Sequence, residues 1–187
     1  MKETEFLRDC LRVARAAYRE AQEEDPGGCI TPFVMAYHPQ FGITPPMPCG
    51  HFMVSQKGKD ILADCMIGLV HKGATEIIFV SEIWRAQEPS KCQDPEEMKK
   101  EAQAFEERAG AWLDKHGSLE GFPNVFDCLM VTHYSDSGDV LKFAKILRDE
   151  ETGERELGEW EDTPVDEYTS HGRFTEIFKR ARQIAGN

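Results

Sequence analysis

Two consecutive segments near the middle of the second half alternate apolar and polar positions with a period of two. They cover residues 125–134 and 140–147, and such alternation is typical of strands with one face buried. The five residues between them, Ser-Asp-Ser-Gly-Asp at 135–139, avoid helices and favour turns. The pattern therefore predicts an antiparallel hairpin.

Apolar residues spaced by three and four positions predict helices elsewhere in the chain. The expected helices lie at 3–23, at 55–72, at 95–116 and from about residue 170 onward. Ser55 suits the N-cap position of the second, and Gly73 suits the left-handed position after its end. The third begins with Asp94, Pro95 and Glu97 as N-cap, first-turn proline and N3 glutamate.

Three further strands complete the expected elements. A short strand fits 31–38, and the segment 75–87 is apolar on both faces, which is typical of a central strand. Residues 155–161 fit a charged edge strand. Between the first two strands, prolines at 39, 45, 46 and 48 exclude a helix and a central strand, so 39–48 is expected to be a loop.

The order of these elements predicts an α+β fold. We expect one domain over 1–187, with a mixed, mainly antiparallel sheet of about four to five strands and helices packed mostly on one face. If the strand at 31–38 pairs with that at 75–87 through the helix at 55–72, the crossover should be right-handed and the pair parallel.

Charge narrows the classes of partner. The formal net charge is -12, which argues against binding to nucleic acid because no basic stripe is present. Residues 149–167 hold ten acidic side chains and one basic, Arg155. The segment is either a solvated edge that deters aggregation or a docking surface for a protein with a basic surface. The candidate contact residues are Trp84, Glu154, Glu156, Glu159 and Trp160.

The compartment is expected to be the cytoplasm. The first twenty residues are too charged for a secretory signal, and the most apolar run, 61–70, is too short to span a membrane. The six cysteines show no Cys-x-x-Cys spacing, which favours reduced thiols. No cofactor motif occurs, so no cofactor is expected.

Glu82 is an acidic residue within an apolar strand and must be hydrogen-bonded, paired or protonated. If its neighbour is the strand that contains His133, the two side chains could pair. The pair would be either a structural contact or a catalytic site in which the carboxylate orients an imidazole.

One metal site is conceivable. His38, Cys49 and His51 could supply three ligands, but the spacing of Cys49 and His51 is too close for a zinc finger and no fourth ligand follows. The expectation is therefore that the protein binds no metal.

Four short fragments resemble a family of uncharacterised bacterial and phage proteins. They are the Phe-Val-Ser-Glu-x-Trp segment at 79–84, Pro-Ser at 89–90, Leu-Met-Val-Thr at 129–132 and Gly-x-Trp at 158–160. The helix at 95–116 interrupts the pattern. The resemblance implies a fold and carries no assigned activity.

Three functions follow from these patterns. The first is a non-catalytic accessory or regulatory protein that acts by binding another protein. The second is a small hydrolytic or proton-transfer enzyme with a site at Glu82 and His133. The third is an acidic inhibitor that mimics DNA, which requires carboxylates in a row along 149–167.

Overall fold

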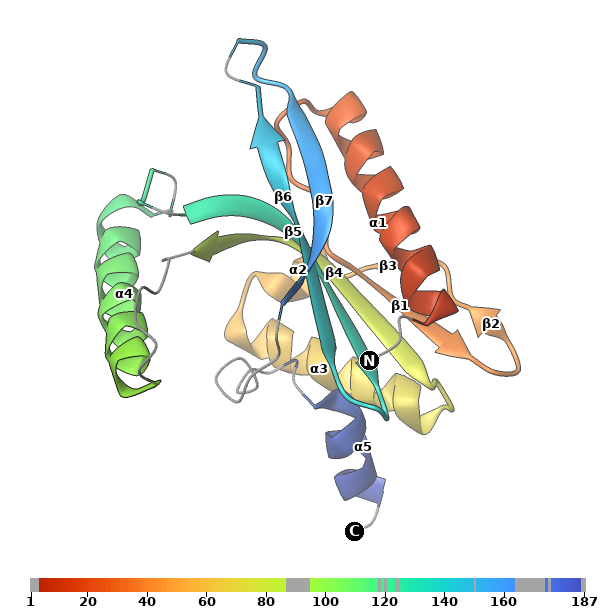
Figure 1. Ribbon diagram of the computed structural model, residues 1–187. Coiled ribbons are helices and arrows are strands. Elements are labelled where there is room, and N and C mark those ends of the chain that lie inside the picture. Colours follow the sequence, from red (N-terminus) through yellow and green to blue (C-terminus); the bar gives the residue numbers. More distant parts are fainter. Residues whose placement is uncertain are drawn as a thin grey trace. The chain divides into compact units, whose positions relative to one another are not determined.

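Figure 1 shows the protein as a computed structural model, which describes residues 4–86, 95–117, 119, 121–123, 125–149, 151–163, 174 and 176–185. The chain forms two compact units. The first consists of Met1–Glu82 and Leu129–Asn187, and the second of Ile83–Cys128. The expectation of a single domain over 1–187 stays a prediction, and the two units are described separately below.

The first unit is built on an antiparallel sheet, so the predicted α+β class is confirmed. Within the described residues the sheet has seven strands, more than the four to five expected, in the order β2-β1-β4-β5-β6-β7 with β3 also paired to β1. The strands are β1 (Phe33–His38), β2 (Gly42–Ile43), β3 (Met47–Pro48), β4 (Glu76–Ala86), β5 (Val125–Ser135), β6 (Val140–Arg148) and β7 (Arg155–Thr163). The predicted hairpin is present as the neighbouring strands β5 and β6.

The helices match the apolar periodicity closely. They are α1 (Glu5–Glu24), α2 (Gly50–Met53), α3 (Gln56–His71), α4 (Pro95–His116) and α5 (Ile177–Ala185). Ser55 caps α3 by accepting from the Gly58 N–H at 3.0 Å, and Gly73 has a φ of +96°, as predicted. The expected helix start near 170 and the Asp94 cap lie outside the described residues.

Helices cover both faces of the sheet, whereas the sequence predicted mainly one. Figure 1 shows α1 on one side, and α3 and α5 on the other. The reason is visible in β1, where Phe33 and Met35 pack in the core with α1 while Val34 and Ala36 pack in the core with α3 and α5. A strand that is apolar on both faces needs a cover on both.

The predicted parallel crossover is wrong, because β1 and β4 pair antiparallel, with Phe33 opposite Val80 and Tyr37 opposite Glu76. The loop at 39–48 explains the difference. Its two short strands, β2 and β3, run back along β1. The chain therefore enters α3 from the starting end of β1 and returns through β4 in the opposite direction.

The second unit contains the end of β4, the long helix α4, the chain that follows it and the start of β5. Trp112 lies at the centre of an aromatic cluster, with ring centroids 4.2 Å from His116 and 5.6 Å from Phe122. Phe105 packs against Phe122 at 5.5 Å. These contacts give the helix, whose role the sequence left open, a small apolar core of its own.

Candidate functional site

Two glutamates lie six residues apart on one face of β4, Glu76 at its start and Glu82 within it. Ile78 and Val80, between them on the same face, are fully buried against α1. Glu76 and Glu82 therefore both lie on the side of the sheet that α1 covers, about 20 Å apart by strand geometry. Each forms a different polar network.

Glu76 joins the start of α1 to the middle of the sheet. Its Oε2 accepts a hydrogen bond from the Thr4 hydroxyl at 2.7 Å, and the Thr4 hydroxyl also caps α1 by accepting from the Leu7 N–H at 3.1 Å. The same Oε2 lies 2.8 Å from His133 Nε2. The three residues link α1, β4 and β5 through one carboxylate oxygen.

His133 is buried, with 3% of its side chain exposed. Burial lowers the pKa of its imidazole, and the bond to Glu76 only partly opposes this effect. The neutral ring donates through Nε2 to the carboxylate, which leaves Nδ1 as an acceptor. Nδ1 is buried and has no hydrogen-bond partner within the described residues.

Glu82 pairs with Arg155 and not with His133. The Arg155 Nη2 forms a very short contact with Glu82 Oε1, and the two side chains are only 6% and 9% exposed. Glu82 also accepts from the Ile30 N–H at 3.3 Å, while Arg155 donates to the carbonyls of Gly27 and Gly28. The pair ties the loop after α1 to β4 and β7.

The predicted Glu82–His133 site is therefore not formed. Strand register is the reason, since His133 meets β4 at Glu76, six residues before Glu82. Glu82 is paired, as the sequence predicted, but its partner is Arg155. The Cys10 thiol, whose pKa is affected by the charge of Glu76, is no nucleophile at neutral pH, because burial raises its pKa to about 12.

The acidic segment forms the edge strand β7. Its inner neighbour β6 pairs with it in an antiparallel register that places Ile146 opposite Leu157 and Ala144 opposite Trp160. Gly158 and Glu159 of β7 thus face the single residue Lys145 of β6, which is a β-bulge in β7. Gly158 lies inside it, where an added Cβ would come 3.3 Å from the Lys145 carbonyl.

The bulge determines on which face of the sheet each side chain of β7 lies. Leu157 and Trp160, three positions apart, both pack in the core against α1. Glu156 and Glu161 pair across with Leu147 and Phe143 and so lie on the opposite face. Arg15 of α1 closes the bulge by donating to the carbonyls of Leu157 and Gly158, at 3.1 and 2.7 Å.

Glu154, Glu156 and Glu159 are exposed, as a contact surface requires, and Trp160 is half-buried beneath the Arg15 guanidinium at 5.9 Å. The Trp84 side chain lies outside the described residues. Asp162 forms an ion pair with Lys142 at 2.7 Å. Both interpretations of the acidic segment remain compatible with this geometry, because a bulged, charged edge strand also resists aggregation.

The conceivable metal ligands lie at opposite ends of β1. His38 ends the strand and is bonded through Nε2 to the Lys72 carbonyl at 3.1 Å and through Nδ1 to the Gln40 N–H at 3.0 Å. The Cys49 N–H instead bonds the Pro32 carbonyl, before the strand begins. Within the described part of the chain, no group of three histidine, cysteine or acidic residues could hold a metal ion.

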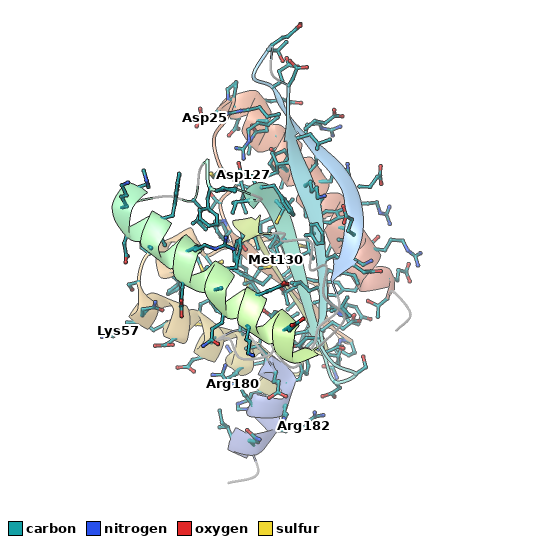
Figure 2. All side chains as sticks on the ribbon, turned by 60° about the vertical axis from the view of Figure 1, so that its left-hand side comes forward. Asp25, Lys57, Asp127, Met130, Arg180 and Arg182 are labelled. Carbon is teal, nitrogen blue, oxygen red and sulfur yellow. The ribbon has the colours of Figure 1, made fainter. Side chains whose placement is uncertain are left out.

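A groove lies between the second half of α1 and the β6–β7 hairpin. It has a volume of about 1050 Å³. Tyr18 and Leu157 belong to its lining and are buried, so they form its floor. Asp25, which is labelled in Figure 2, directly follows α1 and marks the end of the helix that lies beside the groove.

Sequence reasoning missed Glu76, Arg15 and the inward position of Arg155. Glu76 opens β4, where a charged residue is unremarkable, and only the register with β5 reveals its partner. A signal for the bulge was present, because a glycine inside a strand pattern is a common sign of one.

Comparison with protein families, with curated proteins and with solved structures gave no match for this chain. Among the described helices, none has the length and apolar character that crossing a membrane requires. The five described cysteines are all free thiols. The site must therefore be interpreted from its own geometry.

Proposed function

We propose that the protein is a non-catalytic accessory or regulatory protein that binds the basic surface of a partner protein through β7. The observation that carries this proposal is the position of Arg155. It is the one basic residue of the acidic segment, and its side chain is turned inward and paired with Glu82. The exposed charges of β7 are left uniformly negative.

The surrounding structure supports the same interpretation. The carboxylates of Glu154, Glu156, Glu159 and Glu161 are all exposed, so a partner could reach them without any change of fold. The bulge keeps the apolar residues of β7 against α1 and leaves its glutamates outside. Complementary charge would speed association and select for basic partners. Free thiols fit the proposed cytoplasmic location.

A capture experiment tests the proposal. The full chain is compared with a variant that carries Glu156→Gln, Glu159→Gln and Glu161→Gln, and both proteins carry a photo-crosslinker at the neighbouring position 162. A matched control, Glu101→Gln with Glu107→Gln and Asp114→Asn, removes three exposed charges from α4. We expect basic proteins of a cell lysate to crosslink to the parent and the control and to be lost in the β7 variant.

An unchanged crosslinked set in the β7 variant, or an equal loss in the control, would contradict the proposal. The experiment also separates a second candidate, the DNA mimic, which the outward glutamates of β7 favour. If the captured proteins bind DNA and a short duplex added before irradiation prevents their crosslinking, the protein acts as a mimic. If the duplex prevents no crosslink, another kind of basic surface is recognised.

The enzymatic alternative would have to use Glu76 and His133 in place of Glu82 and His133. A general base must come within hydrogen-bond reach of its substrate. His133 is 2% exposed and its bonding nitrogen is already used by Glu76. The polar network there is better explained as the anchor of the start of α1.

A further inference from the structure

The groove between α1 and the β6–β7 hairpin carries both signs of charge. Its lining includes four arginines, Arg15, Arg19, Arg148 and Arg155, and four acidic residues, Glu23, Asp149, Glu154 and Glu156. The lining is thus neutral in sum, on a chain whose net charge is -12. An anionic group would meet less repulsion here than over the acidic strand β7.

Two of these charged side chains, Arg155 and Asp149, already bind other groups of the protein. Arg155 is neutralised by Glu82. The Asp149 carboxylate accepts from the N–H groups of Glu151 and Thr152, at 2.9 and 2.7 Å, and shapes the hairpin turn. Neither is free to bind a ligand without cost to the fold.

Three arginines remain for a ligand. Within the described part of the chain, Arg15, Arg19 and Arg148 form no ion pair with a carboxylate. Arg15 is held in place by the two carbonyls at the bulge and by the ring of Trp160. A guanidinium has five N–H donors, so Arg15 keeps donors for a carboxylate in a fixed position.

Glu23 and Glu154 supply the opposite charge. Glu23, near the end of α1, and Glu154, in the hairpin turn, are both exposed and line the groove. Tyr18 and Leu157 give it an apolar floor. A site of this size with an apolar floor and a few polar groups resembles ligand sites in general.

We infer that this groove binds a short zwitterionic peptide segment, with a carboxylate on Arg15 and Arg19, a basic side chain on Glu23 and Glu154, and an apolar side chain on Leu157. The inference rests on the proposed function, since the segment belongs to the basic partner. It adds that recognition requires an acidic residue of the partner as well as its basic residues.

The test uses three labelled peptides with blocked ends and fluorescence anisotropy. The first is Lys-Leu-Glu-Leu-Lys, the second has glutamine in place of its glutamate, and the third has glutamine in place of both lysines. The protein is the full chain, as the parent, as Arg19→Gln with Arg148→Gln, and as a control, Arg8→Gln with Arg12→Gln. The control arginines lie on α1, are exposed and are absent from the groove lining.

We expect the first peptide to bind the parent and the control alike, and to bind the Arg19 and Arg148 variant about tenfold more weakly, since a charge-assisted contact is lost. The glutamine-for-glutamate peptide should bind the parent and the variant with the same reduced affinity. The third peptide should bind more weakly than the first to all three proteins. A first peptide that does not bind the parent, or binds the variant unchanged, would overturn the inference.

The two proposals fail separately. If the capture by β7 succeeds but the peptide affinities do not depend on Arg19 and Arg148, only the inference about the groove is wrong. If the peptide pattern holds while the crosslinked set is unchanged in the β7 variant, the groove binds peptides and the proposed function is wrong.

Discussion

Glu82 and Arg155, 73 residues apart in sequence, form an ion pair that is almost completely withdrawn from solvent. The pair holds the loop after α1 through the Ile30 N–H and the Gly27 and Gly28 carbonyls. It also decides the surface charge of β7, because it removes the only positive charge of that strand from the surface.

Replacing one partner of this pair should destabilise the protein strongly. In Glu82→Gln the Arg155 guanidinium stays buried without a counter-charge, which costs about 3 to 5 kcal/mol. Chemical denaturation of the variant measures this loss. The double variant Glu82→Leu with Arg155→Met removes both charges and should be more stable than Glu82→Gln alone. A Glu82→Gln protein as stable as the parent would show that the pair contributes nothing to the fold.

The bulge in β7 predicts opposite results for two single-residue deletions. Deleting Gly158 removes the extra residue and leaves Leu157 and Trp160 two positions apart, so both still face α1. We expect this variant to lose about 1 kcal/mol, because Arg15 loses its bond to the Gly158 carbonyl. Deleting Glu156 instead moves Arg155 to the other face and breaks its buried pair with Glu82, which should cost about 3 kcal/mol or more. Thermal melts followed by tryptophan fluorescence compare the two variants, and equal effects would argue against the bulge.

Much of the fold could be predicted because each element carries its own local signal. Ser55 and Gly73 mark both ends of α3, and 135–139 marks the β5–β6 turn, without any knowledge of the rest of the chain. The direction of β4 could not be predicted, since it depends on β2 and β3, which are only two residues each. Strands this short have no detectable period.

The candidate site was predicted less well for a related reason. That Glu82 needs a partner follows from its apolar neighbours, but the identity of the partner depends on register and on how the loop after α1 folds. His133 and Arg155 are both plausible from the sequence. Only the alignment of β4 with β5 assigns His133 to Glu76 and leaves Glu82 to Arg155.

The cysteines should differ sharply in reactivity toward a thiol reagent at pH 8. Cys65 is exposed and should react fast. Cys29 is exposed but should react more slowly, because burial and the nearby Glu82 raise the pKa of its thiol. Cys10 and Cys49, with pKa values raised by burial to about 12 and about 11, should react only after unfolding. Mass spectrometry of a Cys92→Ser protein assigns the labelled sites, and rapid labelling of native Cys10 would contradict its place on the buried face of α1.

His133 should make the stability of the protein depend on pH just below neutrality. Burial lowers the pKa of His133 in the folded state below its usual value of 6.5. The unfolded chain therefore takes up a proton first as the pH falls through 6.5, and stability is lost until the folded pKa is reached. The charged groups that act on the ring are Glu76 and Asp139.

Asp139 acts in the opposite direction. Burial raises the pKa of its carboxyl group above 3.8, so the folded state takes up this proton before the unfolded state and gains stability as the pH falls toward that value. The range just below pH 6.5 therefore reports mainly on His133. We expect the parent to lose about 1 kcal/mol between pH 7 and pH 5.5 relative to His133→Gln, which cannot titrate. Free energies of unfolding from denaturant titrations at each pH give the comparison, with Asp139→Asn as a second variant that should keep the loss. Parallel profiles for the parent and His133→Gln would mean that His133 is not held as a neutral ring against Glu76.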